Sequence, residues 1–352
     1  MRPSAANAYF DALTAEIERE ARQPAATIFL GGGTPNAYDA AAIVRLVGLL
    51  RERFPADAPS GQEISIEINP ELVRPSDFER YVAAGINRLS IGVQSFDPDE
   101  IRVLGRKHTP EQVGAVVRQA RAEGIASVSL DLIFAVPGQS ARSWRDSLDR
   151  AVDLGVDHLS TYGLTIEEHT PYDAWYAREP RAFLDQDDEA ELYAIGIETL
   201  EAAGFEQYEI SNFARPGHTS LHNANYWANG AYVGLGVGAA SYRDGERSVH
   251  TRDLQEYLVA IEAGGPIPGQ SERLEGERRV GEAIMLALRT ARGVDLAGFR
   301  ARYGIDVLEH YAAAVAEYSQ AGLLQSDDRT MRLTKPGRFV ANDVCGAFLS
   351  FE

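Results

Sequence analysis

Cysteine is almost absent from the sequence: of 352 residues, only Cys345 carries a thiol. A single cysteine cannot form an internal disulfide, so oxidative cross-links make no contribution to the stability of the chain. We expect Cys345 to pack as a small apolar residue.

Positive charge is also scarce. Lys107 and Lys335 are the only lysines, arginine supplies the rest of the positive charge, and the formal net charge is −18. A protein that grips nucleic acid through its phosphates needs a basic surface. The composition therefore argues against a nucleic-acid partner.

Long apolar runs are missing as well. No run approaches the ~18 consecutive apolar residues of a membrane span, and the first residues lack a basic segment followed by an apolar one. We predict no transmembrane segment and a cytoplasmic location. Hydrophobic residues make up 45% and charged residues 24% of the chain, as in ordinary globular proteins. Its length suits one large domain with a smaller one attached.

A repeated strand and helix pattern occupies the first two thirds of the chain. Isoleucine at every second position in 63–68 predicts a strand. Further strands are predicted at 88–93, 127–133, 158–164 and 205–210, with helices near 76–84, 110–123, 141–154 and 187–203. Four of these helices end in a glycine followed by an apolar residue, at Gly85, Gly124, Gly155 and Gly204. Such a βα repeat favours a parallel sheet or a barrel.

Polar and apolar residues alternate along these strands, so they lie on opposite faces of the predicted sheet. If the apolar side chains face the helices, Glu67, Gln94 and Asp131 point to the opposite face, near the carboxyl ends of the strands. Barrel enzymes hold their active sites at that end. The apolar run 27–30 breaks there into three glycines, 31–33, which leave the backbone bare for a ligand. The pattern predicts a site for a polar ligand. The alternatives are a plain tight turn and polar residues that only cap loops.

Several motifs resemble one known family. They are Gly-Gly-Gly-Thr-Pro at 31–35, Ser-Ile-Glu-Ile-Asn-Pro-Glu at 65–71, Arg-Leu-Ser-Ile-Gly-Val-Gln-Ser-Phe at 88–96, Leu-Gly-Arg at 104–106 and Leu-Asp-Leu-Ile at 130–133. Their order and spacing resemble the oxygen-independent coproporphyrinogen III oxidase branch of the radical SAM enzymes, from about residue 9 to the C-terminus. The resemblance implies an α/β fold: a partial (β/α) TIM-like barrel of radical SAM type, followed by a small helical, winged-helix-like domain.

The same resemblance implies S-adenosylmethionine as a ligand. The implied cofactor-binding residues are Gly32, Gly33, Thr34, Glu67, Gln94, Arg106, Asp131 and, with a weaker match, Thr165. Gly32, Gly33 and Thr34 would hold the methionyl amino group. Glu67 and Asp131 would accept hydrogen bonds from amino or ribose hydroxyl groups, and Gln94 would bond the ribose. Arg106 would pair with the methionyl carboxylate, and its alternative is a surface ion pair.

A second signature points to haem. Residues 222–227, His-Asn-Ala-Asn-Tyr-Trp, are similar to the His-Asn-x-x-Tyr-Trp signature of the haem chaperones in this branch. The resemblance implies haem binding and transfer to an acceptor protein, with His222 as a possible axial ligand and Tyr226 or Trp227 against the porphyrin. The alternative is a packed loop whose histidine is hydrogen-bonded internally.

Two other functions stay open. One is an oxygen-independent coproporphyrinogen III oxidase-like radical SAM enzyme, in which an adenosyl radical would abstract hydrogen from a porphyrinogen propionate. The other is a conventional barrel enzyme that binds a phosphorylated ligand at the glycine loop.

The sequence departs from the family in one respect. A radical SAM enzyme holds a [4Fe–4S] cluster by Cys-x-x-x-Cys-x-x-Cys after its first strand, and these residues are absent here, so no metal ligands are assigned. In the family the motif precedes the position of Tyr9. We expect a missing N-terminal segment, from a start site placed too late, which would leave 27–30 as an exposed apolar edge.

Three regions are predicted along the chain. They are a partial radical SAM barrel at 1–215, a family-specific connecting region with the His222 to Trp227 motif at 216–275, and a winged-helix-like domain at 276–352. The last region has ten Lys plus Arg and ten Asp plus Glu, which is no electrostatic footprint for DNA. We expect it to serve packing or partner docking.

Overall fold

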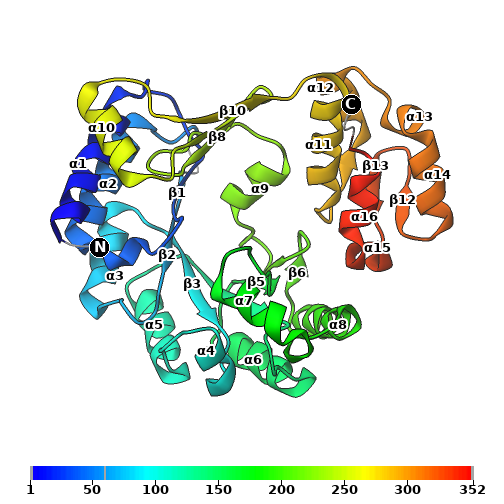
Figure 1. Ribbon diagram of the computed structural model, residues 1–352, viewed down its shortest axis with the longest axis horizontal. Coiled ribbons are helices and arrows are strands. Elements are labelled where there is room, and N and C mark those ends of the chain that lie inside the picture. Colours follow the sequence, from blue (N-terminus) through cyan, green and yellow to red (C-terminus); the bar gives the residue numbers. More distant parts are fainter. Residues whose placement is uncertain (1–2, 59–60, 350–352) are drawn as a thin grey trace. The chain divides into compact units, whose positions relative to one another are not determined.

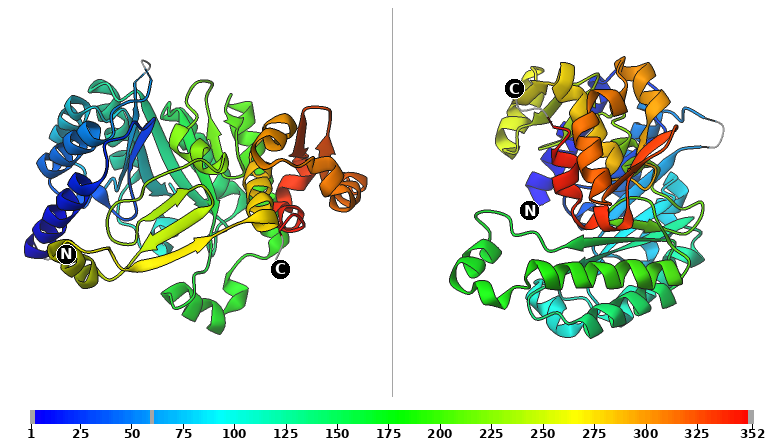
Figure 2. Two further views of the ribbon diagram at one scale, coloured as in Figure 1. Left: turned by 90° about the horizontal axis from the view of Figure 1, so that it is seen from above. Right: turned by 90° about the vertical axis from the view of Figure 1, so that its right-hand side faces the viewer.

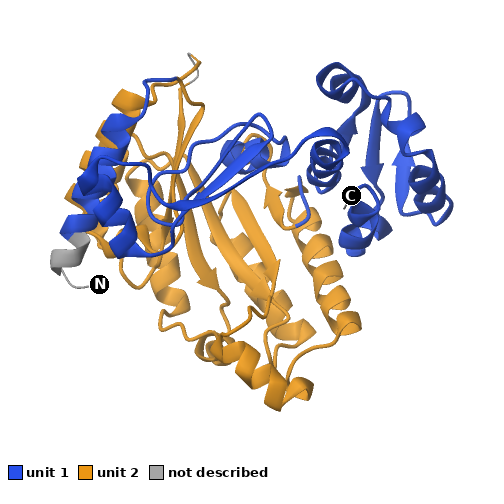
Figure 3. Ribbon diagram, turned by 45° about the horizontal axis from the view of Figure 1, so that its top comes forward, with its two compact units in different colours: residues 1–23, 208–210, 220–352 blue, residues 24–207, 211–219 orange. Residues whose placement is uncertain are grey.

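The computed structural model describes residues 3–58 and 61–349 (Figure 1). The chain forms two compact units: residues 24–207 and 211–219 make up unit 2, and residues 1–23, 208–210 and 220–352 make up unit 1 (Figure 3). The predicted regions follow chain order, whereas unit 1 combines the first residues with the last third of the chain. The two units are described separately below.

Unit 2 is built on one sheet with strand order β1-β2-β3-β4-β5-β7-β6. Its strands are β1 (Thr27–Leu30), β2 (Glu63–Ile68), β3 (Arg88–Gln94), β4 (Ser127–Phe134), β5 (His158–Gly163), β6 (Glu206–Gln207) and β7 (Asn212–Ala214). Strands β1 to β5 are parallel neighbours in chain order. The sheet stays open, as expected of a partial barrel.

The strand predicted at 205–210 is confirmed only for Glu206–Gln207, which form β6. Within this range only these two residues join the sheet, pairing antiparallel with β7, which in turn pairs antiparallel with β5. Glu209 forms an isolated antiparallel bridge with Thr290. The main chain beyond β6 bonds elsewhere, because Ile210 donates to the carbonyl of Arg289, and Tyr208 accepts from Ala291. These bonds remove residues 208–210 from the sheet and end the βα repeat after β5.

Helices connect the parallel strands. They are α2 (Ala40–Arg53), α3 (Pro75–Ala84), α4 (Pro98–Val103), α5 (Pro110–Ala122) and α6 (Ala141–Asp153), followed after β5 by α7 (Pro171–Arg178) and α8 (Gln186–Ala202), with 3-10 turns at η1 (Pro35–Ala37) and η2 (Pro180–Ala182). Right-handed crossovers between strands in sequential order place the long helices on one face of the sheet (Figures 1 and 2). The predicted glycine caps are confirmed: Gly85 and Gly124 have φ of 102° and 94°.

The apolar phase of the strands forms the core of unit 2. Ile66, Leu89 and Leu130 are fully buried beneath the helix layer. Strand β1 lies at the edge of the sheet, as expected, but its apolar side chains are not exposed, because Ile28 and Leu30 are buried. Their register with Ile64 and Ile66 of β2 puts them on the face that the helices cover, so an edge strand without a second neighbour still buries its apolar side chains.

Unit 1 contains α1 (Pro3–Arg19), α9 (Leu221–Trp227), α10 (Leu254–Ala263) and a sheet of β8 (Ala240–Arg243), β9 (Glu246–His250) and β10 (Gly269–Arg273). Helices α1 and α10 pack together around Tyr257 and Ile261. The buried carboxylate of Glu16 on α1 accepts from Tyr257 Oη at 2.6 Å and from Gly236 N at 2.8 Å. The glycine-rich run 234–238 is therefore a packed loop on α1.

The C-terminal part of unit 1 has its own core. Its elements are α11 (Gly276–Leu288), β11 (Val294–Asp295), α12 (Leu296–Tyr303), α13 (Val307–His310), α14 (Ala312–Gln320), β12 (Leu324–Ser326), β13 (Thr330–Leu333), α15 (Lys335–Phe339) and α16 (Ala341–Gly346). Helices leading into the β12–β13 hairpin match the expected winged-helix-like domain. Cys345 is 2% exposed inside this core, as predicted. Among the described helices, none is long and apolar enough to cross a membrane.

Candidate functional site

The glycine loop follows β1 at the carboxyl edge of the unit 2 sheet. Gly32 has φ of 79°, a left-handed conformation that favours glycine, and its N–H donates to Glu67 Oε2 at 3.1 Å. A Cβ on Gly31 would lie 2.3 Å from the Phe29 ring and 2.9 Å from the Glu67 carboxyl. A Cβ on Gly32 or Gly33 would meet no atom within 4 Å. The loop is thus tight on the side of Glu67 and open on the side away from it.

Glu67 and Asp131 lie on the same face of the sheet, as the strand phase predicts. Burial and, as a smaller cause, the nearby Asp131 carboxylate together raise the pKa of Glu67 to about 7, and the Gly32 N–H opposes the shift. Burial also raises the pKa of Asp131 to about 6, against hydrogen bonds from Ser160 and Ser90. Two neighbouring carboxyls that ionise reluctantly are suited to a positively charged ligand, because a cation between them relieves the repulsion.

Serines of the same strands support Asp131. Ser90 Oγ lies 2.9 Å from both carboxyl oxygens of Asp131, and Ser160 stands beside Asp131 in the register of β4 and β5. Neither serine was among the predicted site residues. Their signal was available, since Ser90 lies on the polar phase of an otherwise apolar strand.

Gln94 lies at an irregularity in the pairing of β3 with β4. The register of β3 and β4 shifts between Gly92 and Gln94, and Gln94 has φ of 71°. A Cβ on Gly92 would lie 3.1 Å from Gln94 Nε2, so the amide folds back over Gly92. Because Gly92 pairs with Asp131, the amide lies over the row that carries this carboxylate.

Arg106 and Thr165 lie in loops after α4 and β5. Arg106 is half-buried, and in the described part of the chain no carboxylate lies within ion-pair distance of its guanidinium, so the surface ion pair considered as its alternative is not found. Thr165 is exposed just beyond β5. No hydrogen bond joins either side chain to Glu67 or Asp131 among the described residues.

The His222 to Trp227 motif is a helix, α9, and not a loop, but its histidine is hydrogen-bonded within the motif, as the packing alternative expected. Ser220 caps this helix by accepting from the N–H of Asn223. A hydrogen bond of 2.8 Å joins His222 Nε2 to Tyr226 Oη, and their rings meet edge to face. Residues four apart share a helix face, so His222 and Tyr226 form one partly exposed pair.

Trp227 faces another way. It lies five residues after His222, which is about 140° around a helix of 3.6 residues per turn. The Arg289 guanidinium, from α11, lies 5.5 Å from the centre of the Trp227 ring. Arg302, from α12, donates to the carbonyls of Ala228 and Asn229 at the end of α9. Trp227 therefore anchors α9 within unit 1, and Tyr226 is the aromatic residue of the motif that remains beside His222.

The residues present do not fit an iron–sulfur cluster. Cluster iron in this family is held by cysteine thiolates, and the one thiol, Cys345, is buried in the C-terminal core, where its Sγ lies 3.7 Å from the Met285 carbonyl. Over residues 3–58 and 61–349, no group of three or more His, Cys, Asp or Glu is arranged to hold a metal ion. The described residues therefore offer no set of ligands for a cluster.

After anaerobic reconstitution with iron and sulfide, we expect this chain to hold no [4Fe–4S] cluster, because it lacks three thiolates in one loop. The measurement is protein-bound iron and acid-labile sulfide, with Cys345→Ser as the control that should give the same low values. Near-stoichiometric iron and sulfide with a cluster-type absorption spectrum would contradict the expectation. S-adenosylmethionine should bind weakly for the same reason, with dissociation above the low micromolar range.

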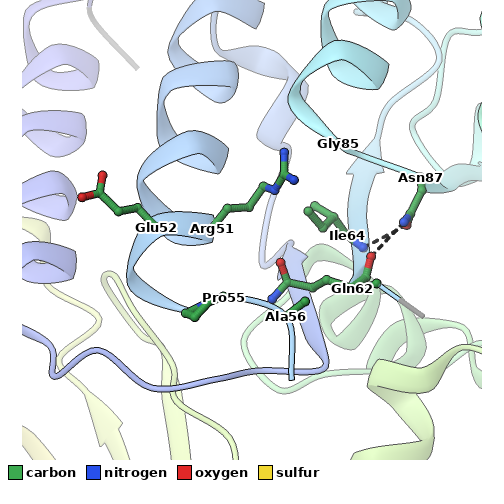
Figure 4. Close-up of a pocket in the computed structure, with 9 residues that line it drawn as sticks. Arg51, Glu52, Pro55, Ala56, Gln62, Ile64, Gly85 and Asn87 are labelled. Carbon is green, nitrogen blue, oxygen red and sulfur yellow. Dashed lines mark hydrogen bonds between the residues drawn. The ribbon is translucent and has the colours of Figure 1, made fainter. Parts of the chain in front are cut away.

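One pocket of unit 2 lies away from this edge of the sheet. A pocket of about 470 Å³ lies at the amino end of β2, between Gln62, Arg51 and Asn87 (Figure 4). Gln62 Nε2 donates to the carbonyls of Ala25 and Phe54, and Asn87 bonds the main chain of Gln62 and Ile64. These polar groups serve the backbone of the fold, so the pocket offers few free groups to a ligand.

A phosphate at the glycine loop is disfavoured. The Gly32 N–H that would bind a phosphate oxygen already bonds Glu67, and two carboxyls beside the loop would repel an anion. This geometry counts against the conventional phosphate-binding enzyme.

Comparisons of sequence and fold relate the chain to known proteins. The Radical SAM superfamily matches residues 4–151 and the HemN C-terminal domain matches residues 274–340. The chain is 32% identical to "Heme chaperone HemW" of Bacillus subtilis, over 97% of the chain and 91% of that protein. It is 38% identical to "Heme chaperone HemW" of Synechocystis, over 81% and 70%. Its fold is similar to coproporphyrinogen III oxidase (HemN) from Escherichia coli, with a TM-score of 0.86 and 24% identity over 100% of the chain and 85% of that structure.

Proposed function

The chain belongs to the HemW haem chaperone family of radical SAM proteins, and from this we propose that it binds haem and S-adenosylmethionine and passes haem to an acceptor protein. The observation that carries the haem part is the His222 and Tyr226 pair on α9. The observation that supports the S-adenosylmethionine part is the paired carboxyls of Glu67 and Asp131 beside the open glycine loop.

The α9 pair supplies what a haem site needs. An imidazole is a common axial ligand of haem iron, and Tyr226, 38% exposed, gives an aromatic ring next to it. The Tyr226 hydroxyl is hydrogen-bonded to His222 Nε2, so iron would bind this nitrogen only after that bond is exchanged. Arg289 and Arg302 keep the helix in place from α11 and α12, so the C-terminal domain contributes to the haem site as a support.

The charge of the sheet edge suits S-adenosylmethionine. This ligand carries a sulfonium and an ammonium group, and either would favour the ionised forms of Glu67 and Asp131. The main-chain groups of Gly32, Gly33 and Thr34 would take the amino group, Gln94 would bond the ribose, and Arg106 would take the carboxylate. Thr165 is proposed as a further contact from the loop after β5.

Asp131→Ala should weaken S-adenosylmethionine binding by about 1–3 kcal/mol, the usual penalty for leaving buried polar groups unpaired. Because binding is expected to be weak, titration followed by ligand-observed NMR is the measurement. Asp146→Ala is the matched control, since Asp146 lies on α6 of the same unit with its side chain 64% exposed.

The affinity of Asp131→Asn for S-adenosylmethionine should lie between those of Asp131→Ala and the wild type, because its amide oxygen can still accept from Ser90. Unchanged binding in Asp131→Ala would mean that this face of the sheet does not contact the ligand. The acceptor protein and the cytoplasmic location remain predictions.

A further inference from the structure

Hydrogen bonds join the glycine loop to the loop after β2. Asn36, 6% exposed, lies in η1 just beyond the glycines. Its Nδ2 donates to the carbonyl of Asn69, and its Oδ1 accepts from the N–H of Asn69, both at 2.9 Å. A reciprocal pair of this kind fixes both the distance and the orientation of the two loops.

Glu71 continues this connection to the Arg106 turn. Asn69 Oδ1 accepts from the N–H of Glu71 at 3.0 Å. The Glu71 carboxylate then accepts through one oxygen, Oε1, from the main-chain N–H of Lys107 at 2.6 Å and of His108 at 3.1 Å. Charge-assisted bonds from two successive amides are among the stronger hydrogen bonds in proteins. The residues directly after Arg106 are thus tied to the end of β2.

The Arg106 turn is also held from its other sides. Gly105 has φ of 66°, and the N–H of Arg106 donates to the carbonyl of Ile101 at 2.9 Å. The side chain of His108 is fully buried beneath the turn, 3.8 Å from Glu71 Oε1. Burial lowers the pKa of His108, so the ring is neutral at pH 7 and leaves the Glu71 carboxylate to the two amides. The backbone of the turn is fixed, while the Arg106 guanidinium has no ion-pair partner in the described chain.

We propose that Glu71, together with Asn36 and Asn69, positions the two ends of the amino-acid part of the ligand. The hydrogen bonds that run from Asn36 through Asn69 and Glu71 to the amides of Lys107 and His108 form a relay. This relay sets the separation between the glycine loop, which takes the amino group, and Arg106, which takes the carboxylate. This inference rests on the proposed function. Glu71 is a positioning residue, because its carboxylate is already bonded to the turn and acts through Arg106.

Two ligands test the relay: S-adenosylmethionine and 5′-methylthioadenosine, which lacks the amino-acid end. Losing two charge-assisted bonds in Glu71→Ala should weaken S-adenosylmethionine binding about tenfold and leave methylthioadenosine unchanged. Glu71→Gln keeps an acceptor oxygen and should restore most of the affinity. Glu79→Ala, an exposed glutamate on α3, is the matched control. Equal losses for both ligands, or none for either, would overturn the proposal.

A double variant tests whether Glu71 acts through Arg106. In an Arg106→Gln background, Glu71→Ala should cause no further loss of S-adenosylmethionine affinity, because the group that it positions is gone. Additive losses would mean that Glu71 acts independently of Arg106, and the proposal would be wrong.

Hydrogen exchange tests the relay without any ligand. In Glu71→Ala, the amides of Lys107 and His108 should exchange faster than in the wild type, and Glu71→Gln should restore part of the protection. Unchanged exchange would overturn the relay even if ligand binding changed. If the wild type binds no S-adenosylmethionine at all, the proposed cofactor is wrong, and the exchange experiment still decides whether Glu71 holds the turn.

Discussion

Replacing His222 with alanine is expected to remove the normal Soret spectrum of the haem complex and to weaken haem binding at least about tenfold. The variant loses the only imidazole of α9 and the ring that packs edge to face on Tyr226. Folding should change little, because His222 is only partly buried. The measurement is haem titration followed by absorption spectroscopy, with circular dichroism as the check on folding.

Two further variants sharpen this result. His169→Ala removes an exposed histidine of unit 2 and should leave the haem spectrum unchanged. Tyr226→Phe keeps the ring but removes the hydroxyl bonded to His222 Nε2, so it should shift the spectrum without abolishing binding. Wild-type affinity and spectrum in His222→Ala would rule out the imidazole as the axial ligand, and α9 would then be explained by packing alone.

Arg88→Ala is expected to lower the free energy of unfolding by about 3–5 kcal/mol, the typical effect of removing one partner of a buried ion pair. Arg88 is 7% exposed at the start of β3, and its Nε lies 2.9 Å from Glu63 Oε2 on β2. Its Nη2 also donates to the carbonyls of His218 and Thr219. The substitution removes the Arg88 donor from the Glu63 carboxylate and from two main-chain carbonyls.

Chemical denaturation of the variants measures this effect. Arg142→Ala is the control, because Arg142 and Asp146 form an exposed pair at 3.9 Å that should contribute less than about 1 kcal/mol. The double variant Arg88→Leu and Glu63→Leu should recover part of the loss, since it leaves no unpaired charge. If Arg88→Ala lowered the free energy of unfolding by no more than Arg142→Ala does, the Arg88 and Glu63 pair would contribute no more than an exposed pair to stability.

Local signals account for the parts of the fold that were predicted correctly. The strands β2 to β5 show an apolar pattern with a period of two, and the helix caps carry a glycine, which favours positive φ. Both signals can be read within a few residues of sequence. The Phe205 to Ile210 strand was confirmed only in part because residues far along the chain, at 289–291, take the main-chain bonds of its second half. The helical form of α9 could have been predicted, since Ser220 before the motif is a normal N-cap residue.

Long-range pairs limited what could be predicted about the site. The strand phase placed Glu67 and Asp131 on one face because each strand carries that information itself. The bonds from Glu71 to the amides of Lys107 and His108 link residues 36 and 37 positions apart, and no local pattern specifies them. Likewise Glu16 meets Tyr257 across 241 positions, so the grouping of α1 with the last third of the chain was invisible in the sequence.

The rate at which a reagent labels the thiol of Cys345 can report how often the C-terminal core opens. Burial raises the pKa of Cys345 to about 11, so the closed core presents neither access nor thiolate to a labelling reagent. With no second cysteine in the chain, every labelling event marks an opening of the helices around α16, and its rate gives the free energy of that opening. Native-state thiol labelling can therefore follow this one core through a haem titration without any engineered probe.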